Sequence, residues 1–265
     1  RAAFFENAKT PLQKAVTEAL YGKNLLMSVS RLETFAECAY TYFLQYGLRL
    51  RARKRNEFAS LDLGNLYHGA LEKYARGLKD AGLTWDSLSE ADMQARLLES
   101  FRAELGSFSD TEIFADAREG HFSRQAFSNL LFNTGIMTEQ IRAGSFVPAY
   151  FEQELTGFSD PSDMTVPIGD GRTLSLTGKI DRIDIASGAG ACYVKIIDYK
   201  TGKNRLDPTK IYAGIQLQLL VYLNAAIDAL GRRTNRKVLP GAVFYYHIKD
   251  SRIDETTPLT DLQLH

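Results

Sequence analysis

The spacing of apolar residues changes near Pro148, from a helical period to a strand period. Before Pro148, apolar residues recur every three to four positions, as Leu66, Ala70 and Tyr74 do in LDLGNLYHGALEKYARGL. After it, apolar and polar residues alternate in short runs between glycine-rich turns. The pattern predicts a helical first half, followed by strands packed around one long helix.

The first half carries several helix boundaries. Predicted helices end at Gly22 and at Gly47, cover the 61–78 segment, and span residues 85–105 and 122–143, with a loop over 106–122. Ser30 and Glu33 have the S-x-x-E spacing of a capping box, which predicts that the helix ending at Gly47 begins there.

The second half predicts an antiparallel arrangement followed by a helix and a last strand. Strands are expected at residues 148–158, on both sides of a turn at 169–171, and on both sides of a turn at 187–190. The segment 207–230 reads as one helix with Pro208 in its first turn, and KVLPGAVFYYHI as a final strand. This order predicts an α/β domain with a mixed sheet.

Composition narrows the possible classes. The 265 residues are 45% apolar and 24% charged with zero formal net charge, as in an ordinary globular domain, so any nucleic-acid contact must come from local basic patches. No run is long enough to span a membrane, and no secretory signal is present. Cys38 and Cys192 are far apart, which argues against a disulfide scaffold and favours the cytoplasm. Because the chain begins with Arg1, we expect a piece of a longer protein.

The stretch IIDYKTGK places an acid and a base two positions apart at the end of an apolar run. Side chains at i and i+2 of a strand share a face, so Asp198 and Lys200 point the same way. They could form a surface salt bridge. They could also be half of a metal-dependent active site, in which a lysine beside the cation orients water and stabilises charge on a phosphoryl oxygen.

The preceding strand brings a second carboxylate to the same face. A turn centred between residues 188 and 189 would pair Asp181 with Ile196, diagonally beside Asp198. A register error of one residue would put the two carboxylates on opposite faces. With the expected register, Asp181, Asp198 and Lys200 converge, and two neighbouring carboxylates suit a hard cation such as Mg²⁺.

Two further features have both a structural and a functional interpretation. His68 lies on a predicted helix four residues after Gly64, so the bare helix surface could admit a metal or a nucleic-acid backbone, although a lone histidine is more often structural. Residues 49–55, RLRARKR, hold five basic residues in seven positions. They are either a solvated charge run or an arm that contacts phosphates.

Two pairs of polar residues also have both a structural and a functional interpretation. Gln218 and Tyr222 share a helix face at i and i+4, where they could be an interfacial pair or part of a site. Glu152 and Glu154 alternate along the strand at 148–158, and either could face solvent.

These motifs resemble a known family. GKIDRID, IIDYKTGK and QLQLLVYL, in this order, resemble the RecB-type nuclease domain of the PD-(D/E)XK superfamily, and LGNLYHGALEKY resembles its histidine-bearing helix. SVSRLETFAECAYTYFLQYGLRLRAR resembles more narrowly the start of the nuclease domain of AddB-type subunits of AddAB helicase–nucleases. The resemblance implies a restriction-endonuclease-like core, a mixed sheet flanked by helices, over residues 28–265 after a helical lead-in at 1–27.

The resemblance also implies roles for single residues. The metal ligands would be His68, Asp181, Asp198 and the carbonyl of Tyr199, and the catalytic group would comprise Lys200 with Asp181 and Asp198. Gln218 and Tyr222 would be the Q-x-x-x-Y pair that supports the site or contacts DNA, and Glu152 matches an acidic family position. The implied reaction is Mg²⁺- or Mn²⁺-dependent hydrolysis of single-stranded DNA, with an AddA-like helicase–nuclease as partner.

Cys38 has two interpretations. Its position on an amphipathic helix suggests a small buried hydrophobe. In AddB-type proteins, a cysteine at this place ligates a four-iron–four-sulfur cluster together with three cysteines of a C-terminal cluster. Cys192 does not fit that pattern, so the cluster cannot be completed from this chain.

Three functions fit these residues. The resemblance favours a metal-dependent nuclease domain of a double-strand-break repair subunit. A non-catalytic DNA-binding or scaffolding module on the same fold would account for the zero net charge. A stand-alone RecB-like exonuclease would share the motifs but not the AddB-like segment.

Overall fold

The computed structural model describes residues 12–51, 60–107, 117–156, 158, 160, 164–202, 204–234 and 236–248. Residues 52–55 of the basic run and most of the expected 106–122 loop lie outside these ranges. The helices are α1 (Lys14–Tyr21), α2 (Val29–Glu37), α3 (Ala39–Tyr42), α4 (Ser60–Asp80), α5 (Glu90–Ser107), α6 (Ala117–Ala143), α7 (Pro208–Tyr212) and α8 (Gln218–Thr234), with a π-helix at Phe43–Gly47 and a 3₁₀ turn at Trp85–Ser87.

The described strands form two sheets. The strands are β1 (Asn24–Ser28), β2 (Val147–Glu154), β3 (Thr165–Gly169), β4 (Arg172–Thr177), β5 (Lys179–Ser187), β6 (Ala191–Lys200) and β7 (Lys237–His247). The larger sheet has the order β2-β5-β6-β7, in which β7 runs parallel to β6 and the other neighbours are antiparallel. The smaller sheet has the order β1-β4-β3. The mixed α/β architecture predicted from the sequence is confirmed.

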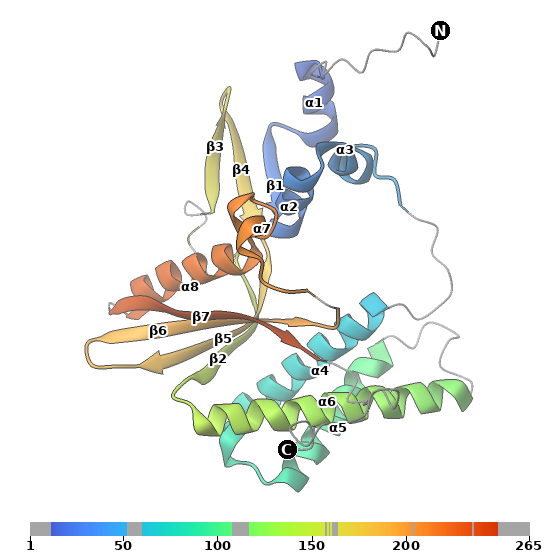
Figure 1. The fold of residues 1–265 in the computed structure, drawn as a ribbon, viewed down its shortest axis with the longest axis vertical. Coiled ribbons are helices and arrows are strands. Elements are labelled where there is room, and N and C mark those ends of the chain that lie inside the picture. Colours follow the sequence, from blue (N-terminus) through green and yellow to red (C-terminus); the bar gives the residue numbers. More distant parts are fainter. Residues whose placement is uncertain are drawn as a thin grey trace.

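Helices cover both faces of the larger sheet (Figure 1). On one face, α8 packs against β6 and β7, and its buried Leu219 and Ala226 join Ile183 and Ile196 in one apolar core. On the other face, α4, α5 and α6 form a second core with Ile197. Each fully buried aliphatic side chain of this kind contributes about 1.5–3 kcal/mol. Strand β6 is therefore fixed from both sides, which holds its carboxyl end in place.

The helix predicted to run from the capping box to Gly47 is wrong in both its start and its continuity. Ser28, not Ser30, is the N-cap, and its hydroxyl accepts from the Arg31 N–H at 3.2 Å. Cys38 then has φ −157° and ψ 103°, which interrupts the helix between α2 and α3. Apolar periodicity continues across this interruption, so the sequence pattern could not reveal it.

Other boundaries also differ from the prediction. The helix expected over 207–230 is two helices, because Gly214 has φ 75° and breaks the chain between α7 and α8. Helix α6 begins at Ala117, inside the expected loop. Strand β1 was not predicted and pairs in parallel with β4. The helices ending at Gly22 and covering 61–78, the turn at 169–171 and the last strand are confirmed.

None of the described helices is long and apolar enough to cross a membrane.

Candidate metal centre

The carboxyl end of β6 gathers side chains from four elements. Asp198 and Lys200 lie on β6, Asp181 on β5, Glu152 on β2 and His68 on α4. The β5–β6 turn is centred one residue later than expected, because Arg182 pairs with Ile197 and Ser187 with Cys192. Continuing that register sets Asp181 directly opposite Asp198 rather than opposite Ile196. The shift is even, so the two carboxylates remain on one face.

His68 makes polar contacts with three other residues of the site. Its Nδ1 lies 3.2 Å from Oε1 of Glu152 and 3.4 Å from Oδ1 of Asp181, and its Nε2 lies 3.1 Å from the Tyr199 carbonyl oxygen. Burial by itself lowers the pKa of His68, but hydrogen bonds to Asp181 and Glu152 outweigh it and raise the pKa to about 10. Without a cation, an imidazolium therefore bridges the candidate ligands.

The sequence suggested a bare helix surface beside His68, but in the structure this surface is covered. A methyl group at Gly64 would lie 3.6 Å from Oγ1 of Thr201, which is ordinary van der Waals contact. An alanine would therefore fit at Gly64, and this part of α4, four residues before His68, lies against the residue that follows β6.

Tyr199 connects Asp181 to His68 through its backbone. Its N–H donates to Oδ2 of Asp181 at 2.7 Å, which fixes that carboxylate while its other oxygen faces His68. The Tyr199 ring is buried in the α4–α6 core and lies edge-on to the imidazole, with centroids 5.6 Å apart. The Tyr199 carbonyl faces the site, where His68 Nε2 lies 3.1 Å from its oxygen.

Asp198 and Lys200 form a close pair at 2.6 Å between Oδ2 and Nζ. The Asp198 side chain is 3% exposed and the Lys200 side chain 24%, so this is not the surface salt bridge considered from the sequence. Burial and the nearby Asp181 raise the pKa of Asp198 to about 6, and Lys200 partly opposes this rise. The ammonium group is thus held beside the buried Asp198 carboxylate and still reaches solvent.

Glu152, not Glu154, is the β2 residue that enters the site. The Glu152 side chain is 4% exposed, and its second oxygen pairs with Lys179 Nζ at 2.6 Å, whereas Glu154 is exposed. Burial tends to raise the pKa of Glu152, but the hydrogen bonds from His68 and Lys179 bring it below its usual value. Lys179 was not predicted as part of the site, although its place two residues before Asp181 on β5 could have indicated it.

Gln218 and Tyr222 lie together at the start of α8, with Gln218 Nε2 donating to the Tyr222 hydroxyl at 3.4 Å. Burial raises the pKa of Tyr222, with smaller contributions from Asp198 and Asp181. A methyl group at Gly178 would come within 2.6 Å of the Tyr222 hydroxyl oxygen, so a glycine is required between β4 and β5. The effect of Asp198 and Asp181 on Tyr222 indicates that the pair lies near these carboxylates.

Cys38 is exposed, contrary to its expectation as a buried hydrophobe. Its Sγ accepts from the Thr41 N–H at 3.4 Å and caps α3, and this hydrogen bonding lowers the pKa of the thiol. Cys192 is buried in β6. An exposed thiol can ligate a cluster, but two separate cysteines cannot form a four-cysteine site.

The donor set fits a divalent cation. His68, Glu152 and Asp181 each offer a ligand atom within 4.8 Å of the others, and the Tyr199 carbonyl adds a further oxygen. Carboxylate and carbonyl oxygens suit Mg²⁺ or Mn²⁺, and His68 adds one nitrogen donor to this mostly oxygen set. Lys179, Lys200 and the protonated His68 balance the three buried carboxylates, so a cation bound here would take the place of the His68 proton.

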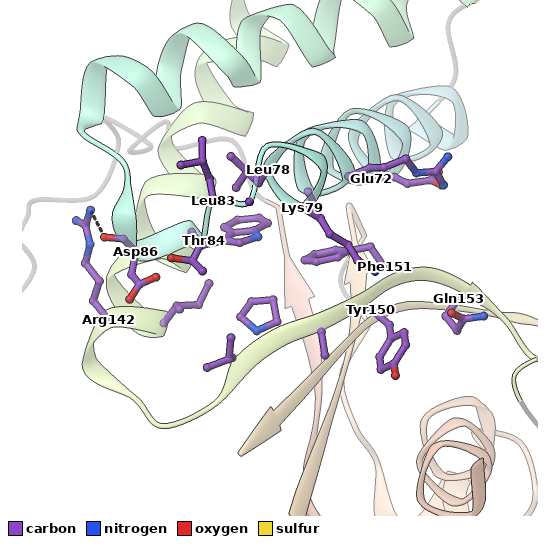
Figure 2. A pocket seen from close by; sticks show the side chains of 18 of the residues that line it. Glu72, Leu78, Lys79, Leu83, Thr84, Asp86, Arg142, Tyr150, Phe151 and Gln153 are labelled. Atoms are coloured by element: carbon purple, nitrogen blue, oxygen red, sulfur yellow. Dashed lines mark hydrogen bonds and ion pairs between the residues drawn. The ribbon is translucent and has the colours of Figure 1, made fainter. Parts of the chain in front are cut away.

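A separate cavity of about 570 Å³ lies beside the site, between α4, the turn after it and β2 (Figure 2). Phe151 and Gln153, which flank Glu152, line it, and Trp85 stacks on Phe151 with centroids 5.7 Å apart. Its lining includes none of the predicted site residues. The cavity therefore shares β2 with the site without sharing its chemistry.

Comparison with known proteins gives a consistent result. A family model described as the PD-(D/E)XK nuclease superfamily matches residues 26–263. The chain is 32% identical over 249 residues to the B subunit of the ATP-dependent helicase/deoxyribonuclease of Clostridium kluyveri, 34% over 263 residues to that of Lachnoclostridium phytofermentans, and 33% over 257 residues to that of Desulforudis audaxviator. These matches cover 94%, 98% and 97% of the chain but 22% of each relative, so the chain spans about a fifth of their length.

Proposed function

The chain belongs to the PD-(D/E)XK nuclease superfamily, and we propose that it is the catalytic nuclease domain of a helicase–nuclease subunit. It hydrolyses phosphodiester bonds of single-stranded DNA with Mg²⁺ or Mn²⁺. The observation that carries the proposal is the convergence of His68, Glu152, Asp181, Asp198 and Lys200 at the end of β6. A purely scaffolding domain would have no need to keep three buried carboxylates and a lysine together.

The chain's own groups divide the work. His68, Asp181, Asp198 and the Tyr199 carbonyl would hold the cation. Glu152, whose carboxylate lies within 4.8 Å of the His68 and Asp181 ligand atoms, would add a ligand or orient His68. A divalent cation held there would supply Lewis-acid chemistry at the phosphate. Lys200, which Asp198 holds at 2.6 Å, orients the attacking water and stabilises the negative charge that develops on the phosphoryl oxygen.

The longer protein supplies the remaining functions. The curated relatives are named as B subunits of a helicase/deoxyribonuclease, which supports a DNA substrate and a partner subunit of the AddA type. The cytoplasm, where such a complex meets chromosomal DNA, is the proposed location. In the full-length protein, Cys38 joins a four-iron–four-sulfur cluster with cysteines from outside this chain.

The direct test is cleavage of end-labelled single-stranded DNA in Mg²⁺, in Mn²⁺ and in EDTA. We expect cleavage that EDTA abolishes and that Lys200→Ala reduces at least about a hundredfold, the usual range for losing a group that stabilises transition-state charge. Lys210→Ala, an exposed lysine of α7, is the matched control. A folded, DNA-binding chain that cleaves nothing would contradict the proposal, and unchanged cleavage by Lys200→Ala would contradict the role of that lysine.

A further inference from the structure

A basic pocket lies apart from the metal centre, between the end of α1, the start of α2 and the chain that follows the π-helix. Its volume is about 670 Å³, and its walls include Tyr21, Arg31, Tyr46, Arg49 and Arg51. In Figure 1, the α1–α3 group lies on the opposite side of the larger sheet from α4, α5 and α6. No residue of the metal centre lines this pocket.

Close packing forms the pocket from elements distant in sequence. A methyl group at Gly47 would lie 2.6 Å from the Tyr21 hydroxyl oxygen, so glycine at this position lets α1 dock on the end of the π-helix. Arg49 has a left-handed backbone, φ 56°, and the Leu50 N–H donates to the Leu44 carbonyl at 3.0 Å. These contacts turn the chain back and set the pocket wall before any ligand binds.

The three arginines play unequal parts. Arg31 is anchored, because its guanidinium donates to the Leu26 carbonyl at 3.3 Å and to the Tyr42 hydroxyl at 3.0 Å, and lies 4.6 Å from the centre of the Tyr46 ring. Arg49 and Arg51 are exposed. Two guanidinium groups are therefore available beside a third that is fixed.

Charge in the pocket is unbalanced. No carboxylate belongs to the pocket wall, and within the described part of the chain the arginine ion pairs involve Arg76, Arg142, Arg172 and Arg182. None of the three pocket arginines is among them, although other exposed arginines such as Arg96 also form no ion pair with the described residues. Because the chain's net charge is zero, such a patch is a local feature rather than part of a generally basic surface.

We propose that this pocket binds the phosphate backbone of a DNA strand, with Arg49 and Arg51 as the contacting groups and Arg31 as the fixed third cation. The inference rests on the proposed function, since the DNA it holds is the strand that the metal centre cleaves. A guanidinium fork matches phosphate geometry, and tyrosine rings beside arginines are typical of strand-binding surfaces. The contact anchors the strand away from the bond that is cut.

The test measures DNA binding by the 265-residue chain in EDTA, with fluorescence anisotropy as the readout over a series of salt concentrations. We expect Arg49→Gln with Arg51→Gln to weaken binding of single-stranded DNA roughly tenfold at low salt. The slope of log affinity against log salt should fall by about 1.4, since each lost phosphate contact on a single strand removes about 0.7. The double lysine variant, R49K with R51K, should retain most of the slope. Duplex DNA of the same length shows whether the pocket also accepts a double strand.

The matched control is Arg96→Gln with Arg102→Gln, which removes the same charge from exposed positions on α5. An equal loss in this control, or no loss in the pocket variant, would overturn the inference and leave the pocket to an acidic segment of a protein partner. Cleavage in Mg²⁺ at saturating DNA separates the two proposals. If the pocket variant binds and cleaves DNA as the wild type does, only the pocket proposal is overturned. If the pocket variant loses binding and neither the wild type nor any variant cleaves DNA, only the nuclease proposal is overturned.

Discussion

Glu152 has a left-handed backbone conformation, φ 45°, in the middle of β2. For a residue with a side chain this costs about 1–2 kcal/mol. Its neighbours Phe151 and Gln153 keep their pairing with β5, so the distortion is confined to the residue opposite Asp181. The distortion accompanies the placement of the carboxylate between His68 and Lys179. Backbone strain of this kind persists where the surrounding structure requires a particular side-chain position.

Glu152→Gln should weaken Mn²⁺ binding about 10–100-fold, the range seen when a ligand or the group that orients it is lost. The amide keeps the size of the side chain but removes the charge that faces His68 and Lys179. Isothermal titration calorimetry on the metal-free protein measures the change. Glu154→Gln, two residues along the same strand and exposed, should bind Mn²⁺ as the wild type does. Equal affinities for the two variants would contradict a role for Glu152 in holding the cation.

Strand periodicity predicts single residues correctly where only an odd or even register shift decides which face a side chain occupies. Asp181, Asp198 and Lys200 share a face in any register shifted by an even number, so a turn placed one residue off did not matter. Periodicity could not choose between Glu152 and Glu154, because the choice depends on a local change of φ. Lys179 was not predicted as a site residue, because periodicity within β5 does not reveal its ion pair with Glu152 on another strand.

The start of α8 depends on a residue almost two hundred positions earlier. Oε1 of Glu33 on α2 accepts from the N–H groups of Leu217 and Gln218, at 2.5 and 2.8 Å. These are among the N–H groups at a helix start that have no partner within the helix. The same carboxylate that the sequence assigned to its own helix cap therefore caps a different helix. It also fixes the backbone of Gln218 beside the site.

Glu33→Ala should lower the free energy of unfolding by about 1–2 kcal/mol, the usual cost of losing a helix cap. It should also reduce DNA cleavage, because the first turn of α8 that carries Gln218 loses its anchor. Glu37→Ala, an exposed residue at the end of α2, should change the free energy of unfolding by no more than about 0.5 kcal/mol and should leave DNA cleavage unchanged. Urea denaturation followed by circular dichroism measures the first effect, and cleavage at fixed DNA concentration the second. Parallel losses in both variants would show that α2 itself, and not the cap, is responsible.

Helix existence was predictable and helix interruption was not. Long apolar stripes identified α4 and α8, because tertiary burial follows the same periodicity. The breaks at Cys38 and Gly214 depend on single backbone conformations inside sequences that remain periodic. Strand β1 was missed because five residues are too few for a period to emerge, and its pairing with β4 is long-range.

In the whole molecule, the metal centre joins the two cores. Asp198 and Tyr199 are adjacent on β6 but face opposite sides of the sheet, Tyr199 toward the α4–α6 core and Asp198 toward α8. His68 reaches the site from α4, and Glu152 from the edge strand β2. A cation held between these groups would tie together parts of the chain that are otherwise connected only by packing. Metal binding and global stability should therefore be coupled.

Mn²⁺ should raise the melting temperature of the chain, and EDTA should reverse the rise. A cation that binds only the folded state stabilises it by about 2.7 kcal/mol at a concentration one hundred times its dissociation constant. The ligands come from four separate elements, so the unfolded chain offers no comparable site.

Asp181→Asn should abolish the Mn²⁺-dependent rise, because its carboxylate faces His68 while also accepting from the Tyr199 N–H. Asp228→Asn, exposed on α8, should respond to Mn²⁺ as the wild type does. A rise of equal size in all three proteins would mean that Mn²⁺ acts elsewhere on the chain, and the metal centre described above would then be wrong.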